Sequence, residues 1–175
     1  MTARYVIDTN VLIAASATDP TSRLRLTASP DDPVLREIVR EWLERFEQTS
    51  ARLVMDGDDS ILTEYQSNLR YDDYGLLVWQ QKWSTSRVDL VELNYDSTGS
   101  PLADEHLKAA VADRSDHKFV ATAIEATRTI GDTNIVNACD SDWCGCEAAL
   151  VSAGVVLEQL LRDWCETKWK EKHPT

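Results

Sequence analysis

The sequence predicts an α/β protein, an α/β/α sandwich built on a central parallel sheet. Five short apolar segments with the composition of strands alternate with segments whose apolar residues recur at helical spacing. Parallel neighbours need crossover connections, which are usually helical. A chain of 175 residues is long enough for one domain with a real core and too short for two ordinary ones. We therefore expect a single domain over residues 1–175 with a five-stranded parallel sheet.

The first half of the chain predicts two strands and three helices. The first strand ends at Asp8, and the second is ARLVMD, residues 51–56, which the turn-forming DGDD closes. Residues 16–32, rich in Asp, Ser, Thr and Pro, predict a loop that holds at most a short helix. Asp32 and Pro33 suit the cap and the first position of a long amphipathic helix. The predicted helices cover residues 33–48, the segment that opens at Ser60, and residues 74–84.

The second half predicts three more strands, again separated by helices. Gly154 is a natural stop for the helix before the last strand, because glycine is common just past a helix C-terminus. The predicted strands are 87–95, 133–139 and 155–160, and the predicted helices are 101–112, 116–127, 146–153 and a C-terminal helix at about 162–172.

The chain is strongly acidic. Its 18 Lys and Arg residues against 30 Asp and Glu residues give a formal charge of −12, which is unfavourable for a protein that approaches a phosphate backbone. A group of acids at one metal site would account for part of this excess, because a bound divalent cation reverses the local sign. The net charge therefore does not exclude a nucleic-acid partner.

The composition favours a cytoplasmic protein with no membrane partner. No apolar run approaches the roughly 20 residues of a membrane span, and the N-terminus has no basic segment leading into an apolar signal core. Cys144-Gly-Cys146 does not have the spacing of a common structural zinc site. We expect reduced thiols at Cys139, Cys144, Cys146 and Cys165.

Acidic residues follow two of the predicted strands. Asp8 closes the first strand, and Asp140 closes TNIVNACD in the same way. In an open parallel sheet, ligands bind beyond the carboxyl ends of the strands. If these two strands are neighbours, the two carboxylates meet above the sheet. Glu64 and Asp116 complete the set if their helices begin at the same edge.

Four segments resemble, in order and spacing, the acidic motifs of PIN-domain nucleases. They are YVIDTNVLIAA, ILTEY, DHKFVATA and IVNACDSDW, and together they span almost the whole chain. The resemblance implies a sheet of order 3-2-1-4-5 and an endoribonuclease that hydrolyses phosphodiester bonds, most often in single-stranded RNA. It implies that Mg²⁺ or Mn²⁺ is held by four catalytic and metal-binding acids, which are Asp8, Glu64, Asp116 and Asp140.

Further residues around these motifs are candidates for the site. Under the resemblance, Asp142 is an accessory metal ligand, and Asn10 orients Asp8 or a water molecule. His117, beside the third acid, is a candidate general acid or phosphate contact for orienting substrate or water. The sequence also departs from the compact toxin members of the family, because Ala138 stands where they usually carry a hydroxyl residue and because the chain is longer.

A physical argument supports a metal ion independently of the resemblance. Several carboxylates packed into a partly buried crevice repel one another and raise one another's pKa values unless a cation neutralises them. Oxygen ligands select hard divalent ions such as Mg²⁺ or Mn²⁺. Four acids suffice for one ion or for a pair, and a pair would clamp the attacking and leaving oxygens of a phosphoryl displacement.

Each acid also has a purely structural interpretation. Asp8 and Asp116 are suitable caps for the helices that follow them. Glu64 fits a solvated helix position, and Asp142 fits an Asx turn. Asp113 is the nearest substitute for Asp116 as the third acid.

The sequence is also compatible with two other functions. One is a binding or regulatory module that keeps the fold without cleaving and uses its acidic surface to hold a basic partner. The other is a haloacid-dehalogenase-like phosphatase with Asp8 as nucleophile, although such enzymes usually carry an aspartate where Asn10 stands.

The partners follow from the same patterns. Single-stranded RNA is the expected substrate, in the setting of a toxin, a defence component or an RNA-processing enzyme. The apolar face from Val34 to Phe46 fits the protein core, and it equally fits a second copy of the chain or an antitoxin helix. The tryptophans fit the core, and Trp143, next to the acids, is the one candidate for stacking on a base.

Overall fold

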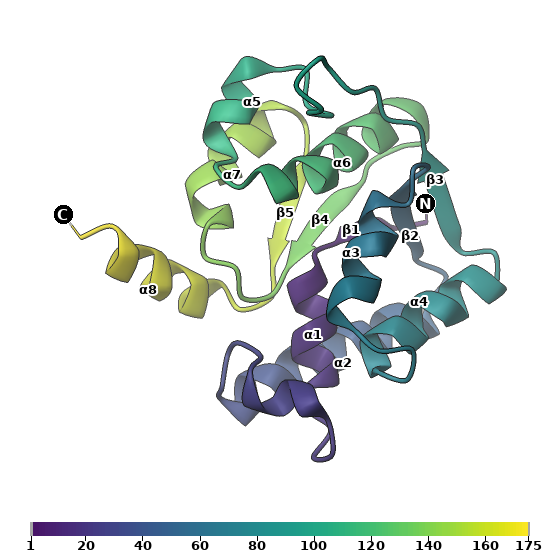
Figure 1. The fold of residues 1–175 in the computed structure, drawn as a ribbon, viewed down its shortest axis with the longest axis vertical. Helices are drawn as coiled ribbons and strands as arrows, with labels where there is room; N and C mark the ends of the chain where they lie inside the picture. The colour runs from purple at the N-terminus through teal and green to yellow at the C-terminus, as the bar shows by residue number, and fades with distance from the viewer. Residues whose placement is uncertain (1, 175) are drawn as a thin grey trace.

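A sheet of five parallel strands forms the centre of the computed structural model, which describes residues 2–174 (Figure 1). The strands are β1 (Arg4–Ile7), β2 (Arg52–Asp56), β3 (Val88–Val91), β4 (Asn134–Asn137) and β5 (Val156–Gln159). Their order across the sheet is β3-β2-β1-β4-β5. The predicted α/β fold, the all-parallel sheet and the strand order 3-2-1-4-5 are confirmed.

The central strand β1 lies between β2 and β4 and is buried on both faces. Val6 and Ile7, with Ile135 and Val136 on β4, are at most 1% exposed, as expected of strands that helices cover on both sides. Ile7 is paired with Val136 in the parallel register. The two strands therefore end together, and the residues that follow them leave the same edge of the sheet.

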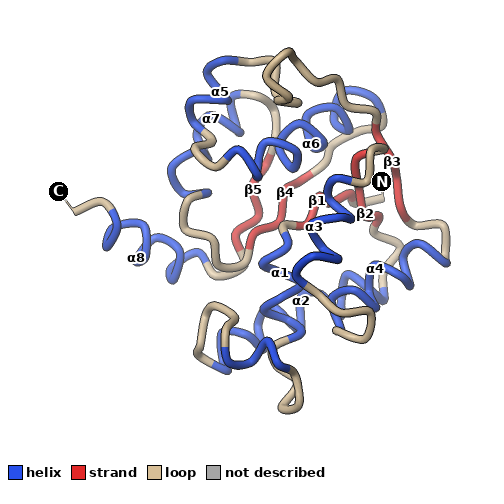
Figure 2. Tube along the Cα trace, in the orientation of Figure 1, coloured by secondary structure: helices blue, strands red, loops and turns tan. Residues whose placement is uncertain are grey.

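The helices lie on both faces of the sheet, as Figure 2 shows, and all of those described except α8, which follows the last strand, lie in connections between strands. They are α1 (Thr9–Ser16), η1 (Arg23–Leu26), α2 (Pro33–Gln48), α3 (Ser60–Asn68), α4 (Tyr74–Ser84), α5 (Glu105–Ala110), η2 (Arg114–Asp116), α6 (His117–Thr129), α7 (Trp143–Ser152) and α8 (Arg162–Lys172). Right-handed crossovers in this strand order place α2 and α4 on one face and α6 and α7 on the other. On its face, α6 packs against β1, β2, β3 and β4.

Some predicted elements are shorter or longer than expected. The predicted helix 101–112 is reduced to α5, because Asp104 caps it through a hydrogen bond from the Leu107 backbone N–H at 3.0 Å. The predicted strand 87–95 ends at Val91, because its partner β2 ends at Asp56 in the paired register. In the opposite sense, α7 begins at Trp143, before the predicted start at residue 146.

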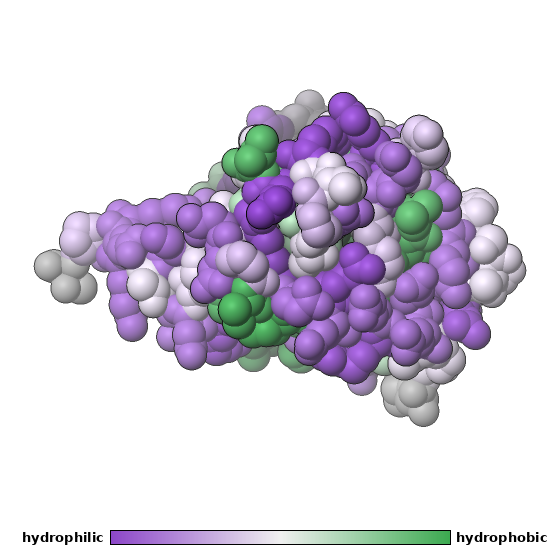
Figure 3. Space-filling view, turned by 90° about the horizontal axis from the view of Figure 1, so that it is seen from below, coloured by the Kyte–Doolittle hydropathy of each residue, from purple (hydrophilic) through white to green (hydrophobic). Residues whose placement is uncertain are grey.

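Helix α2 shows how the expected apolar face is divided. Asp32 caps the helix by accepting a hydrogen bond from the Val34 backbone N–H at 2.8 Å, as the sequence predicts. Val39, Leu43 and Phe46 enter the core, whereas Val34 remains 69% exposed. Core packing therefore accounts for most of this face. The face of the molecule drawn in Figure 3 is mainly polar, with a few separate apolar groups.

Helix α8 extends away from the rest of the fold at its C-terminal end (Figure 1). It is attached to α7 by Trp169, whose ring lies so close to Gly145 that an added Cβ would be 2.5 Å from the ring atom Cη2. Glycine thus permits the close approach of the two helices. Across residues 2–174, no helix has both the length and the apolar composition needed to cross a membrane.

A buried lysine joins the end of α2 to the start of β2. Lys82 is fully buried, and its Nζ donates hydrogen bonds to the carbonyl oxygens of Phe46 at 2.6 Å, Thr49 at 3.0 Å and Ala51 at 2.9 Å. The last carbonyls of a helix have no partner within the helix. The Lys82 ammonium supplies one, and it also lies 4.2 Å from the centre of the Phe46 ring.

We expect Lys82→Met to lower the free energy of unfolding by about 2–4 kcal/mol, because it leaves buried carbonyl oxygens without a donor. Chemical denaturation monitored by circular dichroism measures this loss. The exposed Lys170 provides the matched control, and Lys170→Met should change the free energy by no more than about 0.5 kcal/mol. Equal stability of the two variants would contradict a role for Lys82 in the fold.

Candidate metal-binding site

The site lies at the carboxyl edge of the sheet, where β1 and β4 end side by side. The backbone N–H of Asp8 donates to the carbonyl oxygen of Val136 at 2.9 Å, so that Asp8 continues the pairing of the two strands. Asp140 follows β4 in the loop that leads to α7. The expectation that these two acids leave neighbouring strands at one edge agrees with this arrangement.

Three of the four expected acids come together. Asp8, Asp116 and Asp140 each offer a carboxylate oxygen, and these oxygens all lie within 4.8 Å of one another. Asp8 is buried, with 6% of its surface exposed, and the other two are half-buried. They line an open cleft of about 420 Å³, which Asp113 also lines. The three side chains come from the end of β1, from η2 and from the β4–α7 loop.

The electrostatics of this triad favour a cation. Burial, reinforced by the neighbouring charges of Asp140 and Glu64, raises the pKa of Asp8 to about 7, although hydrogen bonds from Trp143 and Asn10 act in the opposite direction. Burial and then the charge of Asp8 raise the pKa of Asp116 to about 8. Burial also raises the pKa of Asp140. A divalent ion would relieve both the desolvation and the mutual repulsion of these carboxylates.

Asp8 is held in place by a tryptophan. The indole Nε1 of Trp143 donates to Asp8 Oδ2 at 2.6 Å, and the backbone N–H of Asn10 donates to Asp8 Oδ1 at 3.2 Å. The Trp143 side chain is 1% exposed, which places it in the core and leaves no ring face open for a base. Its role at the site is to orient a carboxylate. Its position three residues after Asp140 was the signal for this role in the sequence.

Two asparagines connect the loop that carries Asp140 to the start of α1. The side-chain Nδ2 of Asn10 donates to Asn137 Oδ1 at 2.9 Å, and Asn10 Oδ1 accepts from the backbone N–H of Ala138 at 2.9 Å. Asn137 in turn accepts from the Asp140 backbone N–H at 3.1 Å and donates to its carbonyl oxygen at 2.9 Å. Asn10 therefore orients Asp140 through its side chain and Asp8 through its backbone.

Asn137 was not expected from the sequence as a site residue. It is fully buried at the end of β4. A polar amide within an otherwise apolar strand is a signal of a buried hydrogen-bond network, and NIVN carries that signal.

Asp142 lies apart from the triad. Its carboxylate is exposed and forms an ion pair with Lys172 at 2.7 Å. Its backbone N–H donates to Asp140 Oδ1 at 2.9 Å. Asp142 thus supports Asp140 through the main chain, in an Asx turn whose accepting side chain is that of Asp140 and not, as the sequence suggested, that of Asp142. The Asp142 carboxylate is directed to α8.

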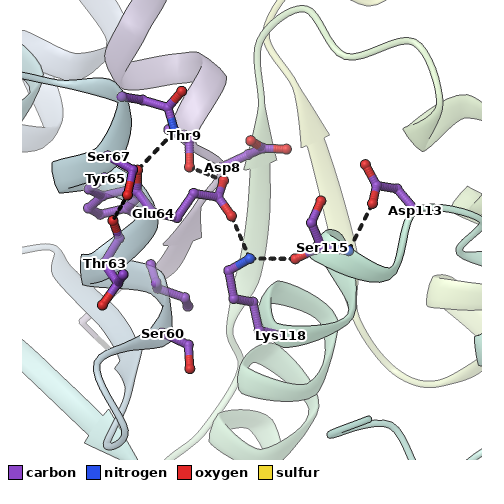
Figure 4. Close-up of polar contacts among 12 residues, drawn as sticks. Asp8, Thr9, Ser60, Thr63, Glu64, Tyr65, Ser67, Asp113, Ser115 and Lys118 are labelled. Carbon is purple, nitrogen blue, oxygen red and sulfur yellow. Dashed lines mark hydrogen bonds and ion pairs between the residues drawn. The ribbon is translucent and has the colours of Figure 1, made fainter. Parts of the chain in front are cut away.

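Glu64 lines the same cleft, but its carboxylate has other partners. Helix α3, which carries it, is anchored by Tyr65, whose hydroxyl donates to the carbonyl oxygen of Ile7 at 2.5 Å. Glu64 Oε1 accepts from the Thr9 hydroxyl at 2.5 Å, and Oε2 forms an ion pair with Lys118 (Figure 4). Glu64 is therefore placed beside the triad and is neutralised there by a lysine.

His117 occupies a structural position in place of the expected contact with substrate or water. It is 5% exposed, its Nε2 lies 2.8 Å from the carbonyl oxygen of Val111, and its Nδ1 lies 3.3 Å from the Ser100 hydroxyl. Both ring nitrogens are thus engaged in holding the segment before α6. Asp113, the substitute for the third acid, accepts from the Ser115 backbone N–H at 2.8 Å and caps η2.

We expect the metal-free protein to lose stability as the pH rises from about 4 to about 8. In this window the folded state holds protons on Asp8 and Asp116, with pKa values of about 7 and 8, whereas the unfolded chain releases them near 3.8. The folded state binds more protons, so the free energy of unfolding falls with rising pH and becomes level above the folded pKa values.

Thermal unfolding of chelator-treated protein at a series of pH values measures this gradient. The variant Asp8→Asn removes one of the two titrating groups, and its gradient should be shallower than that of the native protein. Added Mn²⁺ should raise the unfolding temperature more at pH 8 than at pH 5, because the ion binds the ionised carboxylates. Parallel gradients in both proteins would contradict the raised pKa of Asp8.

We expect Trp143→Phe to weaken Mn²⁺ binding by about 10-fold, because it removes the donor that orients the Asp8 carboxylate. Isothermal titration calorimetry measures the affinity, and thermal unfolding checks that the variant is folded. Trp164, a half-buried tryptophan of α8, supplies the control Trp164→Phe, which should leave the affinity unchanged. An unchanged affinity in Trp143→Phe would show that the indole does not orient the ligand.

Comparisons of the chain with protein-family models, with curated proteins and with solved structures found no match.

Proposed function

We propose that this protein is a metal-dependent nuclease that hydrolyses phosphodiester bonds in single-stranded RNA. The observation that carries the proposal is the convergence of Asp8, Asp116 and Asp140, whose carboxylate oxygens lie within 4.8 Å of one another in an open cleft. These acids come from three separated parts of the chain, and their burial without a cation is costly. A structural role for each acid alone does not require that they meet.

The donor set fits Mg²⁺ or Mn²⁺. The three ligand groups are carboxylates, which hard divalent ions prefer. The one thiol that lines the cleft, that of Cys139, donates to the carbonyl oxygen of Ser29 at 3.1 Å. Burial raises the pKa of Cys139 to about 12, so the thiol stays protonated and is a poor ligand for a softer metal.

The residues of the site divide into metal ligands and the groups that orient them. Asp8, Asp116 and Asp140 would hold the ion. Trp143 orients the Asp8 carboxylate, and Asn10 fixes the backbone of the loop that carries Asp140. A divalent ion bound there supplies a Lewis acid that stabilises charge on phosphoryl oxygens and makes a water molecule more acidic. The cleft is open to solvent and so would admit the substrate, and Asp8 lines it with only 6% of its surface exposed.

The lining of the cleft suits a single strand of RNA. Besides the acids it presents polar groups of Thr27, Ser29, Asn68 and Ser115. Hydroxyl and amide groups of this kind hydrogen-bond to sugar hydroxyls and base edges, which are accessible in an unpaired strand. The resemblance of the four acidic segments to PIN-domain nucleases supports the same proposal, and the strand order that it implies is the one observed.

The phosphatase alternative is less favoured by the geometry around Asp8. A nucleophilic aspartate of that kind needs a second acid two positions later to act on the leaving group. Here that position is Asn10, and its side chain is used to bind Asn137 and the backbone of Ala138. The non-catalytic binding module is distinguished from the nuclease by activity alone.

We expect Asp8→Asn to reduce cleavage of single-stranded RNA by at least about 100-fold, because it removes a central ligand of the ion and several kcal/mol of transition-state stabilisation with it. The assay uses labelled single-stranded RNA and DNA with Mg²⁺, Mn²⁺ or chelator. The exposed Asp163 on α8 gives the control Asp163→Asn, which should cleave at the native rate.

Three outcomes would argue against this function. Equal cleavage by Asp8→Asn and the native protein would remove Asp8 from the reaction. Full activity in chelator would remove the metal. Release of phosphate from a small monoester without cutting of nucleic acid would favour the phosphatase.

A further inference from the structure

Glu64, the acid that does not join the triad, has both carboxylate oxygens in use. One oxygen accepts from the Thr9 hydroxyl at 2.5 Å, and the other forms an ion pair with Lys118. The resemblance implies that an acid at this position is a metal ligand. For Glu64 to bind an ion through the second oxygen, the Lys118 ammonium would have to leave.

Lys118 approaches Glu64 from helix α6. It lies in the first turn of α6, two residues after Asp116, and its Nζ also donates to the carbonyl oxygen of Ser115 at 2.6 Å. Its side chain is 15% exposed and that of Glu64 is 26% exposed. Figure 4 shows Lys118 reaching from α6 toward Glu64 on α3, below Asp8. The pair therefore joins α3 to α6 next to the cleft that Glu64 lines.

The position of this ammonium bears on the number of metal ions. A second divalent ion on Glu64 would lie against the Lys118 ammonium, and two cations at that distance repel each other. The fold already holds the half-buried Lys118 ammonium in place through its hydrogen bond to the Ser115 carbonyl oxygen. Its desolvation is therefore part of folding and adds no cost when a metal ion binds to the triad. One positive charge thus stands next to Glu64 before any ion binds.

We propose that Lys118 takes the place of a second metal ion, so that the protein binds one divalent ion, on Asp8, Asp116 and Asp140. Glu64 is then a positioning residue that holds the ammonium beside the triad. This inference rests on the proposed metal site and adds the number of ions and the role of Lys118. It assigns Glu64 to a task different from that of the three aspartates.

Counting bound ions tests the inference without any assay of activity. Isothermal titration calorimetry with MnCl₂, in the absence of nucleic acid, gives the number of ions per chain. The native protein should bind one. Lys118→Met removes the ammonium and frees Glu64, and this variant should bind two. The double variant Lys118→Met with Glu64→Gln removes the freed ligand and should bind one again.

Two further variants guard against effects on folding or on general charge. Lys118→Arg keeps the positive charge and should still bind one ion. Lys168→Met removes a lysine that pairs with Glu171 on α8, away from the cleft, and should also bind one ion. Circular dichroism establishes which variants are folded, and Lys118→Gln replaces Lys118→Met if the latter is not.

The outcomes separate this inference from the proposed function. Two ions on the native protein, or one ion on a folded Lys118→Met or Lys118→Gln variant, would overturn the role of Lys118 and leave the metal site standing. No ion on the native protein would overturn the metal site itself, and the inference with it.

Discussion

The structure of the site depends on one unfavourable term, the burial of the Asp8 carboxylate at the end of the central strand. A charged group in that position loses its hydration, and its pKa rises to about 7 as a result. Hydrogen bonds from the Trp143 indole and from the Asn10 backbone N–H offset part of this lost hydration. Within residues 2–174, no lysine or arginine forms an ion pair with Asp8. Glu64, in contrast, is paired with Lys118, and this difference makes a divalent ion the natural partner of Asp8.

The strand order turns this local constraint into a site. Because β1 is paired with β4, the residues after Ile7 and after Asn137 leave the sheet next to each other. The amides of Asn10 and Asn137 then bind one another and fix the backbone around Asp140. Fully satisfied buried polar networks of this kind rigidify their surroundings. The ligands are thus held by rigid elements, as a metal site with a defined geometry requires.

Much of this could be predicted from the sequence, because it depends on local patterns. Helical spacing predicted α2, α4 and α8 with their observed bounds. The acids that end strands predicted that Asp8 and Asp140 meet if their strands are neighbours, and the strand order that the PIN-domain resemblance implies supplied that condition. The remainder depends on contacts between segments that are distant in the chain. The pairing of Glu64 with Lys118 requires the relative placement of α3 and α6, and the burial of His117 requires Val111 and Ser100 around it. Periodicity carries no information on either.

The net charge of −12 includes the acids of the site. A protein with this charge repels a polyanion at long range, so in the proposed nuclease the affinity for nucleic acid would have to come from groups at the cleft. Three of the acids that contribute to the charge lie within the triad, where a divalent ion would cancel two of their three charges, and Glu64 is already cancelled by Lys118. With an ion bound, the cleft would therefore carry a smaller share of the negative charge than the number of its acids suggests. Under the proposed function, such a site would engage few phosphates at a time, which would suit a short unpaired segment better than an extended duplex.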